Sequence, residues 1–111
     1  MTSNSKSVAE ISVNALKALM DDNKSPVLID VREPHEVKIA SIGGTLIPLK
    51  TLPDRINEIP KDVPVVVYCR SGGRSAKACE FLMSHGFTNV KNMAGGVLNW
   101  ADKIDPAMQK Y

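Results

Sequence analysis

An apolar run from Val63 to Tyr68 leads directly into the segment CRSGGRS at residues 69–75, and this junction limits the fold more than any other segment. The run is rich in β-branched residues and apolar on both faces, which is typical of a central strand in a parallel sheet. The following seven positions contain a cysteine, two glycines and two arginines. The chain must therefore bury this strand on both faces and deliver Cys69 at its carboxyl end.

The residue types in this loop predict a reactive thiolate in an anion-binding cradle. A free thiol is mostly protonated at neutral pH, and positive charge or a helix N-terminus favours its reactive anion. Arg70 and Arg74 supply fixed positive charge, and Gly72 and Gly73 let successive backbone N–H groups point inward. The helix expected to begin near Ser75 would add its positive dipole end. We expect a small anionic ligand that reacts with the thiolate.

Length and charge narrow the architectures and the partners. A chain of 111 residues has the size of one domain with a single core. The net charge of +2 comes from interspersed signs, so nucleic acid is not expected as a partner. The first residues are polar, which predicts neither a signal peptide nor a membrane span. We expect a cytoplasmic domain over residues 8–104, with a flexible N-terminal tail at 1–7 and a C-terminal tail at 105–111.

Two cysteines and two histidines are the remaining side chains with reactive or metal-binding chemistry. Cys79 falls within the helix predicted after the loop, so both thiols are expected to stay reduced. A small apolar residue on the inner helix face is its predicted role, and a resolving thiol for an oxidised Cys69 is the alternative. His35 and His85 have unrelated spacing, so we predict no metal site and no cofactor.

Short apolar runs alternate with segments of helical periodicity, and this alternation predicts a three-layer α/β fold. We expect a central, mainly parallel five-stranded sheet with helices on both faces. The predicted strands are 8–11, 27–31, 46–47, 63–68 and 89–93. The predicted helices follow Ser12, start at Pro34, and span about 52–59, 75–85 and 97–103. Ligands of such sheets bind beyond the carboxyl ends of the strands, where Asp30, Arg32 and Cys69 all fall.

Four segments resemble, in their order and spacing, those of a known family. CRSGGRS after an apolar strand is similar to its active loop, and LIDVREPHE at 28–36 to its early strand motif. IPL at 47–49 resembles its middle strand, and NMAGGVLNW at 92–100 its C-terminal signature. The family is that of the single-domain rhodaneses, which are sulfurtransferases. The resemblance extends from about Ile11 to Trp100.

The resemblance implies a three-layer rhodanese-like domain that transfers sulfur through Cys69. This cysteine would take a sulfane sulfur from a donor such as thiosulfate, hold it as a persulfide, and pass it to a thiol or cyanide acceptor. The substrate-binding positions of the loop would be Arg70, Ser71, Gly72, Gly73, Arg74 and Ser75. Asp30 and Arg32 match a pair that braces the loop in relatives. Many relatives place a histidine and a proline where this chain has residues 41–44, which puts the donor preference in doubt.

Several interpretations stay open beside the resemblance. A cysteine-dependent phosphatase or arsenate reductase has a similar cradle, but with five residues between cysteine and arginine, whereas four separate Cys69 from Arg74. A non-turnover sulfur-carrier or regulatory binding module would carry the same loop. Asp30 could be a turn residue with Arg32 as its exposed ion-pair partner. Gly96, with its neighbouring glycine, is expected under the active loop or only in a tight turn.

The expected partners follow from the sulfur chemistry. They are a small anionic sulfur donor, a thiol or cyanide acceptor and, as a further candidate, a sulfur-relay protein. No membrane or nucleic acid is expected. The chain is predicted to be a monomer or a weak dimer.

Overall fold

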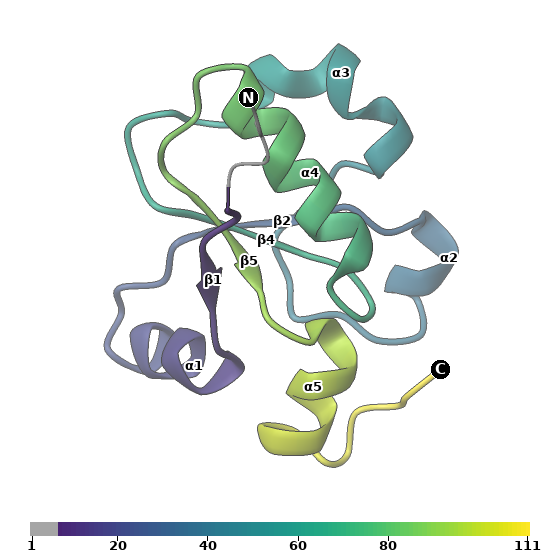
Figure 1. The fold of residues 1–111 in the computed structure, drawn as a ribbon. Coiled ribbons are helices and arrows are strands. Elements are labelled where there is room, and N and C mark those ends of the chain that lie inside the picture. The colour runs from purple at the N-terminus through teal and green to yellow at the C-terminus, as the bar shows by residue number, and fades with distance from the viewer. Residues whose placement is uncertain (1–6) are drawn as a thin grey trace.

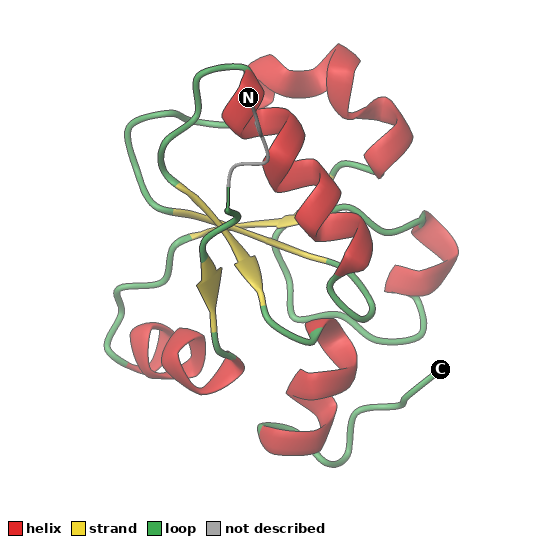
Figure 2. Cartoon of the chain, in the orientation of Figure 1, coloured by secondary structure: helices red, strands yellow, loops and turns green. Residues whose placement is uncertain are grey.

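The computed structural model describes residues 7–111 and contains a five-stranded sheet between helices (Figures 1 and 2). The strands are β1 (Glu10–Ile11), β2 (Val27–Asp30), β3 (Thr45–Leu46), β4 (Val65–Tyr68) and β5 (Val90–Met93). They lie in the order β1-β5-β4-β2-β3, and each neighbouring pair is parallel. The predicted α/β class and its five-stranded parallel sheet are confirmed. Most of the predicted N-terminal tail, residues 1–6, lies outside the described residues.

The central position belongs to β4, which pairs with β2 on one side and β5 on the other. All four of its residues are buried, as the apolar run predicts. The strand begins at Val65 and not at Val63, because Pro64 has no backbone N–H to donate to a neighbouring strand. Val63 is instead 40% exposed.

Helices cover both faces of the sheet (Figure 1). α1 (Val13–Asp21) and α5 (Gly96–Lys103) lie on one face, and α3 (Leu52–Arg55) and α4 (Gly73–Ser84) on the other. Successive side chains of β4 point to opposite faces, so its residues alternate between two cores. Val65 and Val67 pack with Cys79 and Leu82 of α4. The second core contains Val66, Tyr68, Leu16, Val97 and Trp100.

The helix predicted over 52–59 is not continuous. The segment consists of the 3₁₀ turn Leu49–Thr51, the four-residue α3, and a second 3₁₀ turn, Ile56–Glu58. The backbone of Arg55 leaves the helical region with φ −118° and ψ 13°. Its guanidinium group pairs with Glu58 and donates to the carbonyl oxygen of Leu46. This pairing ties the irregular segment to the sheet.

Two helix starts are set by local sequence. The Ser12 hydroxyl accepts a hydrogen bond from the backbone nitrogen of Ala15 at 3.0 Å, so the predicted N-cap of α1 is confirmed. Gly72 adopts φ +108°, a conformation that glycine reaches without a steric penalty. This turn starts α4 at Gly73, two residues before the predicted start at Ser75.

The strand order creates a switch point between β2 and β4. These strands are neighbours, but the chain continues from β2 outward to β3 and from β4 in the opposite direction to β5. The connections that follow them therefore separate, which leaves room for a ligand at the carboxyl ends of the strands. Cys69 follows β4 directly, and Arg32 lies two residues after β2.

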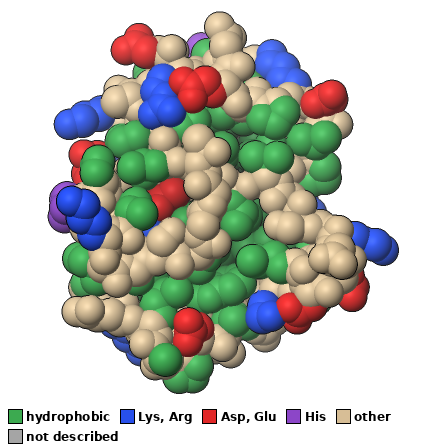
Figure 3. All heavy atoms as spheres, turned by 180° about the vertical axis from the view of Figure 1, so that it is seen from behind, with side chains coloured by type: hydrophobic (Ala, Val, Ile, Leu, Met, Phe, Trp, Pro, Cys, Tyr) green, Lys and Arg blue, Asp and Glu red, His purple; other side chains and the backbone are tan. Residues whose placement is uncertain are grey.

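The molecular surface carries charges of both signs. Figure 3 shows the face turned away from the viewer in Figure 1, with hydrophobic side chains across its middle and acidic and basic side chains mostly around its edge. Among the helices of residues 7–111, none is long and apolar enough to span a bilayer.

Candidate functional site

Cys69 occupies the carboxyl end of the central strand and is only 1% exposed. The neighbouring strand is held in register at this end, because the backbone nitrogen of Val31 donates to the carbonyl oxygen of Tyr68 at 3.1 Å. The loop 70–75 then curls back over the cysteine and enters α4. The thiol thus lies between a rigid strand and the first turn of a helix.

Three donors from the loop surround the sulfur. The backbone nitrogens of Gly72 and Ser75 lie 3.1 and 3.4 Å from Cys69 Sγ, and Ser75 Oγ lies 3.3 Å away. Burial opposes ionisation of the thiol, but the hydroxyl and backbone N–H donors outweigh it and lower the pKa of Cys69 below its ordinary value. The loop therefore stabilises the thiolate relative to that of an ordinary cysteine. The donors that surround it are N–H and O–H dipoles.

Asn92 in β5 holds the key hydroxyl of this cradle from below. Its Oδ1 lies beside Ser75 Oγ as the alternative acceptor for the single hydroxyl proton, which can go either to Asn92 or to Cys69 Sγ. Its Nδ2 donates to the carbonyl oxygen of Gly72 at 3.2 Å. The residue is 2% exposed. Sequence reasoning gave Asn92 no role of its own, although a polar residue in a short buried strand is a usable signal.

The N-terminus of α5 lies directly under the active loop. The backbone nitrogens of Val97 and Leu98 donate to the carbonyl oxygens of Cys69 and Arg70 at 2.9 and 3.0 Å. Gly96, with φ +63°, approaches so closely that a β-carbon would lie 2.4 Å from the Arg70 carbonyl oxygen. Gly96, the first residue of α5, therefore does more than make a tight turn, because the loop rests against it.

Asp30 and Arg32 form a buried ion pair beside the loop. Arg32 Nη2 lies 2.8 Å from Asp30 Oδ2, and the two side chains are 0% and 3% exposed. The guanidinium group also donates to the carbonyl oxygen of Ala40 and to the hydroxyl of Tyr111. The interpretation of Arg32 as an exposed partner is wrong. Burial opposes its charge, but the bonds to Asp30 and Tyr111 prevail and raise the pKa of Arg32.

This pair supports the walls of the site and does not touch the sulfur. Within the described residues, the hydrogen bonds of the Arg32 side chain go to Asp30, Ala40 and Tyr111, and none goes to the loop 70–75. Its guanidinium carbon lies 5.6 Å from the ring centre of Tyr68, the residue before the cysteine. A bracing role for the pair stays a prediction.

The side chains of both loop arginines are hydrogen-bonded to other residues of the same chain. Arg74 makes a two-pronged bond to Glu36, with Nη1–Oε1 and Nη2–Oε2 distances of 2.6 and 2.8 Å. Arg70 donates to the main-chain oxygen of Tyr111 through Nε and Nη2. In the part of the chain that the structure describes, neither guanidinium group donates to Cys69. The two positive charges that the sequence places around the thiolate are therefore hydrogen-bonded to Glu36 and Tyr111 instead.

Glu36 and Tyr111 are site neighbours that sequence reasoning missed. Glu36 belongs to the short helix α2 (Pro34–Val37), where its carboxylate also accepts from the backbone nitrogen of Glu33 in a capping box. Tyr111 lies within the predicted C-terminal tail, yet its hydroxyl donates to Glu36 Oε2 at 2.9 Å. The bond to Arg74 prevails over burial and lowers the pKa of Glu36 to about 2.

Cys79 lies on the inner face of α4 and is fully buried. Both cysteines are free thiols. Burial raises the pKa of Cys79 to about 12, so this thiol stays protonated and inert. The predicted packing role is confirmed by its place in the core that α4 covers.

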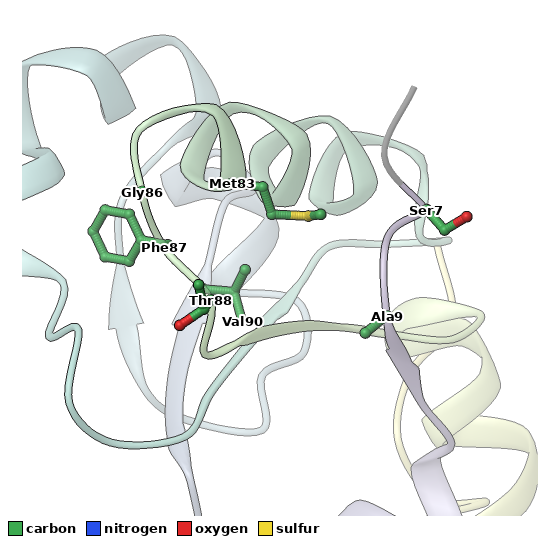
Figure 4. A pocket seen from close by; sticks show the side chains of 7 residues that line it. All are labelled: Ser7, Ala9, Met83, Gly86, Phe87, Thr88 and Val90. Atoms are coloured by element: carbon green, nitrogen blue, oxygen red, sulfur yellow. The ribbon is translucent and has the colours of Figure 1, made fainter. Parts of the chain in front are cut away.

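A hollow of about 370 Å³ lies between the C-terminal end of α4 and the chain that leads into β1 (Figure 4). Its lining residues are Ser7, Ala9, Met83, Gly86, Phe87, Thr88 and Val90. None of these described residues has a titratable side chain, and the loop 69–75 is not among them. Within residues 7–111, no group of three or more His, Cys, Asp or Glu side chains is arranged to hold a metal ion. The loop 69–75, which carries the Cys69 thiol, is therefore the candidate functional site.

An α/β sheet that presents a cysteine in a loop of inward N–H groups defines a class of protein, and comparisons with known proteins identify the family. The Rhodanese-like domain model matches residues 12–103. A sulfurtransferase of Allochromatium vinosum is 42% identical over 95 residues, which cover 85% of this chain and 89% of that protein. The chain belongs to the rhodanese-like sulfurtransferase family.

Further relatives place the same fold in other settings. A rhodanese-like domain protein from Staphylococcus aureus superimposes with a TM-score of 0.79 at 31% identity, covering 87% of this chain and 95% of that one. The adenylyltransferase and sulfurtransferase MOCS3-2 of Zea mays is 34% identical over 111 residues. That match covers 93% of this chain but only 23% of the maize protein. Several of the relatives are thus much longer than this chain.

Proposed function

We propose that this protein moves a sulfane sulfur from a donor such as thiosulfate, through a persulfide on Cys69, to a thiol or cyanide acceptor. The observation that carries the proposal is the set of donors around Cys69 Sγ, two backbone N–H groups and the Ser75 hydroxyl. Family membership supports sulfur transfer in general, and the donor and acceptor belong to the proposal. Arg70, Ser71, Gly72, Gly73, Arg74 and Ser75 form the substrate-binding loop.

The first half-reaction loads the cysteine. The Cys69 thiolate attacks the outer sulfur of the donor, an S–S bond forms, and the donor's own S–S bond breaks. With thiosulfate, sulfite leaves with the bonding electron pair, and the cysteine becomes a persulfide anion. The hydrogen-bond donors of Gly72 and Ser75 can stabilise the negative charge first on Sγ and then on the added sulfur. This is the electrostatic role of pre-organised donors.

The second half-reaction unloads the cysteine. A thiol or cyanide attacks the terminal sulfur of the persulfide, and the electrons of the broken S–S bond return to Cys69 as a thiolate. Cyanide leaves as thiocyanate, and a thiol leaves as a new persulfide. Because donor and acceptor use the same site in turn, the kinetics should be of the ping-pong type.

The rival phosphoryl chemistry is less well supported. A phosphatase needs its loop arginine to bind the phosphoryl oxygens in a bidentate manner. In this protein Arg74 already spends both Nη groups on Glu36. A non-turnover carrier would load sulfur on Cys69 but would fail to release it to small acceptors.

The setting of the reaction is also part of the proposal. A free thiolate is best preserved in a reducing compartment, so we propose a cytoplasmic location. We also propose that the protein is a monomer or a weak dimer. Relatives include a protein named as both adenylyltransferase and sulfurtransferase, which supports a sulfur-relay protein as a donor or acceptor.

Intact mass measurement after incubation with a sulfur donor tests the proposal. The wild-type protein should gain the mass of one sulfur atom, and cyanide should remove it with release of thiocyanate. Cys69→Ala should gain nothing. Absence of the added mass with every donor, or its persistence in Cys69→Ala, would refute the proposal. An aryl phosphate assay of the same samples tests the rival chemistry.

A further inference from the structure

We propose that Glu36 is a specificity-determining residue that favours neutral or weakly charged organic persulfides over the thiosulfate dianion as sulfur donors. By pairing with Arg74, it withdraws one of the two loop charges that would otherwise bind a sulfonate group. This inference rests on the proposed sulfur transfer through Cys69 and adds to it the chemical class of the donor.

The geometry of the Glu36–Arg74 pair is that of a fixed structural contact. Both carboxylate oxygens bind both terminal nitrogens of Arg74, at 2.6 and 2.8 Å, in the strongest arrangement available to these groups. The Glu36 side chain is 9% exposed, and the backbone nitrogen of Glu33 and the Tyr111 hydroxyl hold it in place. A donor sulfonate would have to displace a well-anchored carboxylate to reach Arg74.

Arg70 is similarly occupied. Its Nε and Nη2 both donate to the main-chain oxygen of Tyr111, and its guanidinium carbon lies 5.2 Å from the tyrosine ring centre. The third arginine of the region, Arg32, is neutralised by Asp30 and is 0% exposed. Three guanidinium groups thus face two carboxylates, Asp30 and Glu36. Within the described chain, each of these three guanidinium groups already has a protein acceptor.

The charge of the sulfur donor determines how strongly the pairing of Arg74 with Glu36 slows its binding. Thiosulfate brings two negative charges to a site that already holds a thiolate, and sulfite carries both away. An organic persulfide, R–S–SH, brings none in its protonated form. The Cys69 thiolate attacks its outer sulfur, the S–S bond of the donor breaks, and the persulfide proton leaves with the thiol R–SH. The products are the Cys69 persulfide anion and R–SH, so the charge at the site is unchanged.

The test compares two donors on the same protein preparations. Rates of sulfur loading below saturation are followed by rapid quench and intact mass, with thiosulfate and with 2-hydroxyethyl persulfide. Glu36→Gln removes the charge but keeps an amide that can complete the capping box. Glu58→Gln is the matched control, because Glu58 also makes a two-pronged bond to an arginine, accepting from Nε and Nη2 of Arg55 on an exposed surface.

We expect Glu36→Gln to raise the thiosulfate rate constant about tenfold, the order expected when one charge near a partly exposed site is removed. Its rate with the organic persulfide should stay within about twofold, and the thiosulfate gain should shrink at high salt. Glu36→Asp keeps the charge and should retain the wild-type ratio of the two rates. Glu58→Gln should behave as the wild type does.

The ratio of the two rates is insensitive to the fraction of folded protein, so partial unfolding of a variant cannot imitate the effect. An unchanged ratio in Glu36→Gln, or a wild-type protein that loads faster from thiosulfate than from the persulfide, would overturn the role of Glu36. These results would leave the proposed function intact, provided that sulfur is loaded on Cys69. Failure of the wild type to load from either donor would instead refute sulfur transfer itself.

Discussion

A β-carbon on Gly96 would lie 2.4 Å from the carbonyl oxygen of Arg70, so the first turn of α5 and the active loop are in direct backbone contact. The carbonyl oxygens of Cys69 and Arg70 accept the backbone N–H groups of Val97 and Leu98 across this contact. The loop is therefore supported by the first turn of α5, which begins 27 residues after Cys69. Its curvature depends on that support as much as on its own glycines.

Replacing Gly96 with alanine should displace the loop. The left-handed backbone alone costs about 1–3 kcal/mol for a residue with a side chain, and the contact with the Arg70 backbone adds to it. We expect Gly96→Ala to lose stability in urea unfolding and to load sulfur at least tenfold more slowly. Gly43→Ala is the control, since Gly43 has φ +95° and open space around its missing β-carbon. Equal losses in both variants would show that only backbone strain matters.

Ser75→Ala should move the pH profile of sulfur loading to higher pH. In the wild type, burial is outweighed by the donors of the loop, and the pKa of Cys69 is lowered. The loading rate should rise with pH through this pKa and then level off. A hydrogen bond to a charged group contributes about 1.5–3 kcal/mol, so its loss should slow loading about tenfold or more at pH values below the wild-type pKa. The loading rate at each pH is measured by rapid quench and intact mass.

The control for this experiment is Ser84→Ala, which removes an exposed hydroxyl at the other end of the same helix. Its profile should overlay that of the wild type. If Ser75→Ala lowered the rate equally at every pH, the hydroxyl would act by positioning the loop and not by stabilising the thiolate.

Asp30→Asn should destabilise the protein strongly. The substitution leaves the buried Arg32 charge without its carboxylate, and breaking a buried pair in this way costs about 3–5 kcal/mol. Asp62→Asn, at an exposed position, should change the free energy of unfolding by less than about 0.5 kcal/mol. Urea unfolding followed by tryptophan fluorescence gives both values. A loss below about 1 kcal/mol in Asp30→Asn would contradict a bracing role for the pair.

Only one of the two thiols should be reactive in the folded protein. The pKa of Cys79 is raised to about 12 by burial, whereas that of Cys69 is lowered. Iodoacetamide at neutral pH should therefore add one carbamidomethyl group to the native wild type and none to Cys69→Ala. Both thiols should react after unfolding in guanidinium. Native labelling of Cys79 would revive its interpretation as a resolving thiol.

Sequence patterns were sufficient for the parts of this fold that depend on local physics. The apolar run before Cys69 predicts the central strand, and Ser12 precedes a predicted helix, whose first turn it caps in the structure. The boundaries are less predictable. Gly72 starts α4 two residues early, because its positive φ places Gly73 and Arg74 in the first helical turn.

The candidate site was only partly predictable, for a different reason. The loop is contiguous in sequence, so its chemistry can be inferred from residue types alone. The partners of its arginines are not contiguous, since Glu36 lies 38 residues before Arg74 and Tyr111 lies 41 residues after Arg70. No periodicity connects such positions. The role of Asn92 is unpredictable for the same reason, because its partner Ser75 is 17 residues away on another element.

The pairing of β1 with β5 bears on how the thiol matures during folding. Glu10 lies opposite Asn92, 82 residues further on, and contacts of such separation form late because of the entropy of closing a long loop. Asn92 is also the residue that holds the Ser75 hydroxyl beside Cys69. A chain in which β5 has not joined the sheet lacks this contact to the Ser75 hydroxyl. The loop that lowers the pKa of Cys69 is thus supported by the assembled sheet, so the reactive form of the thiol, which oxidises most readily, belongs to the finished fold.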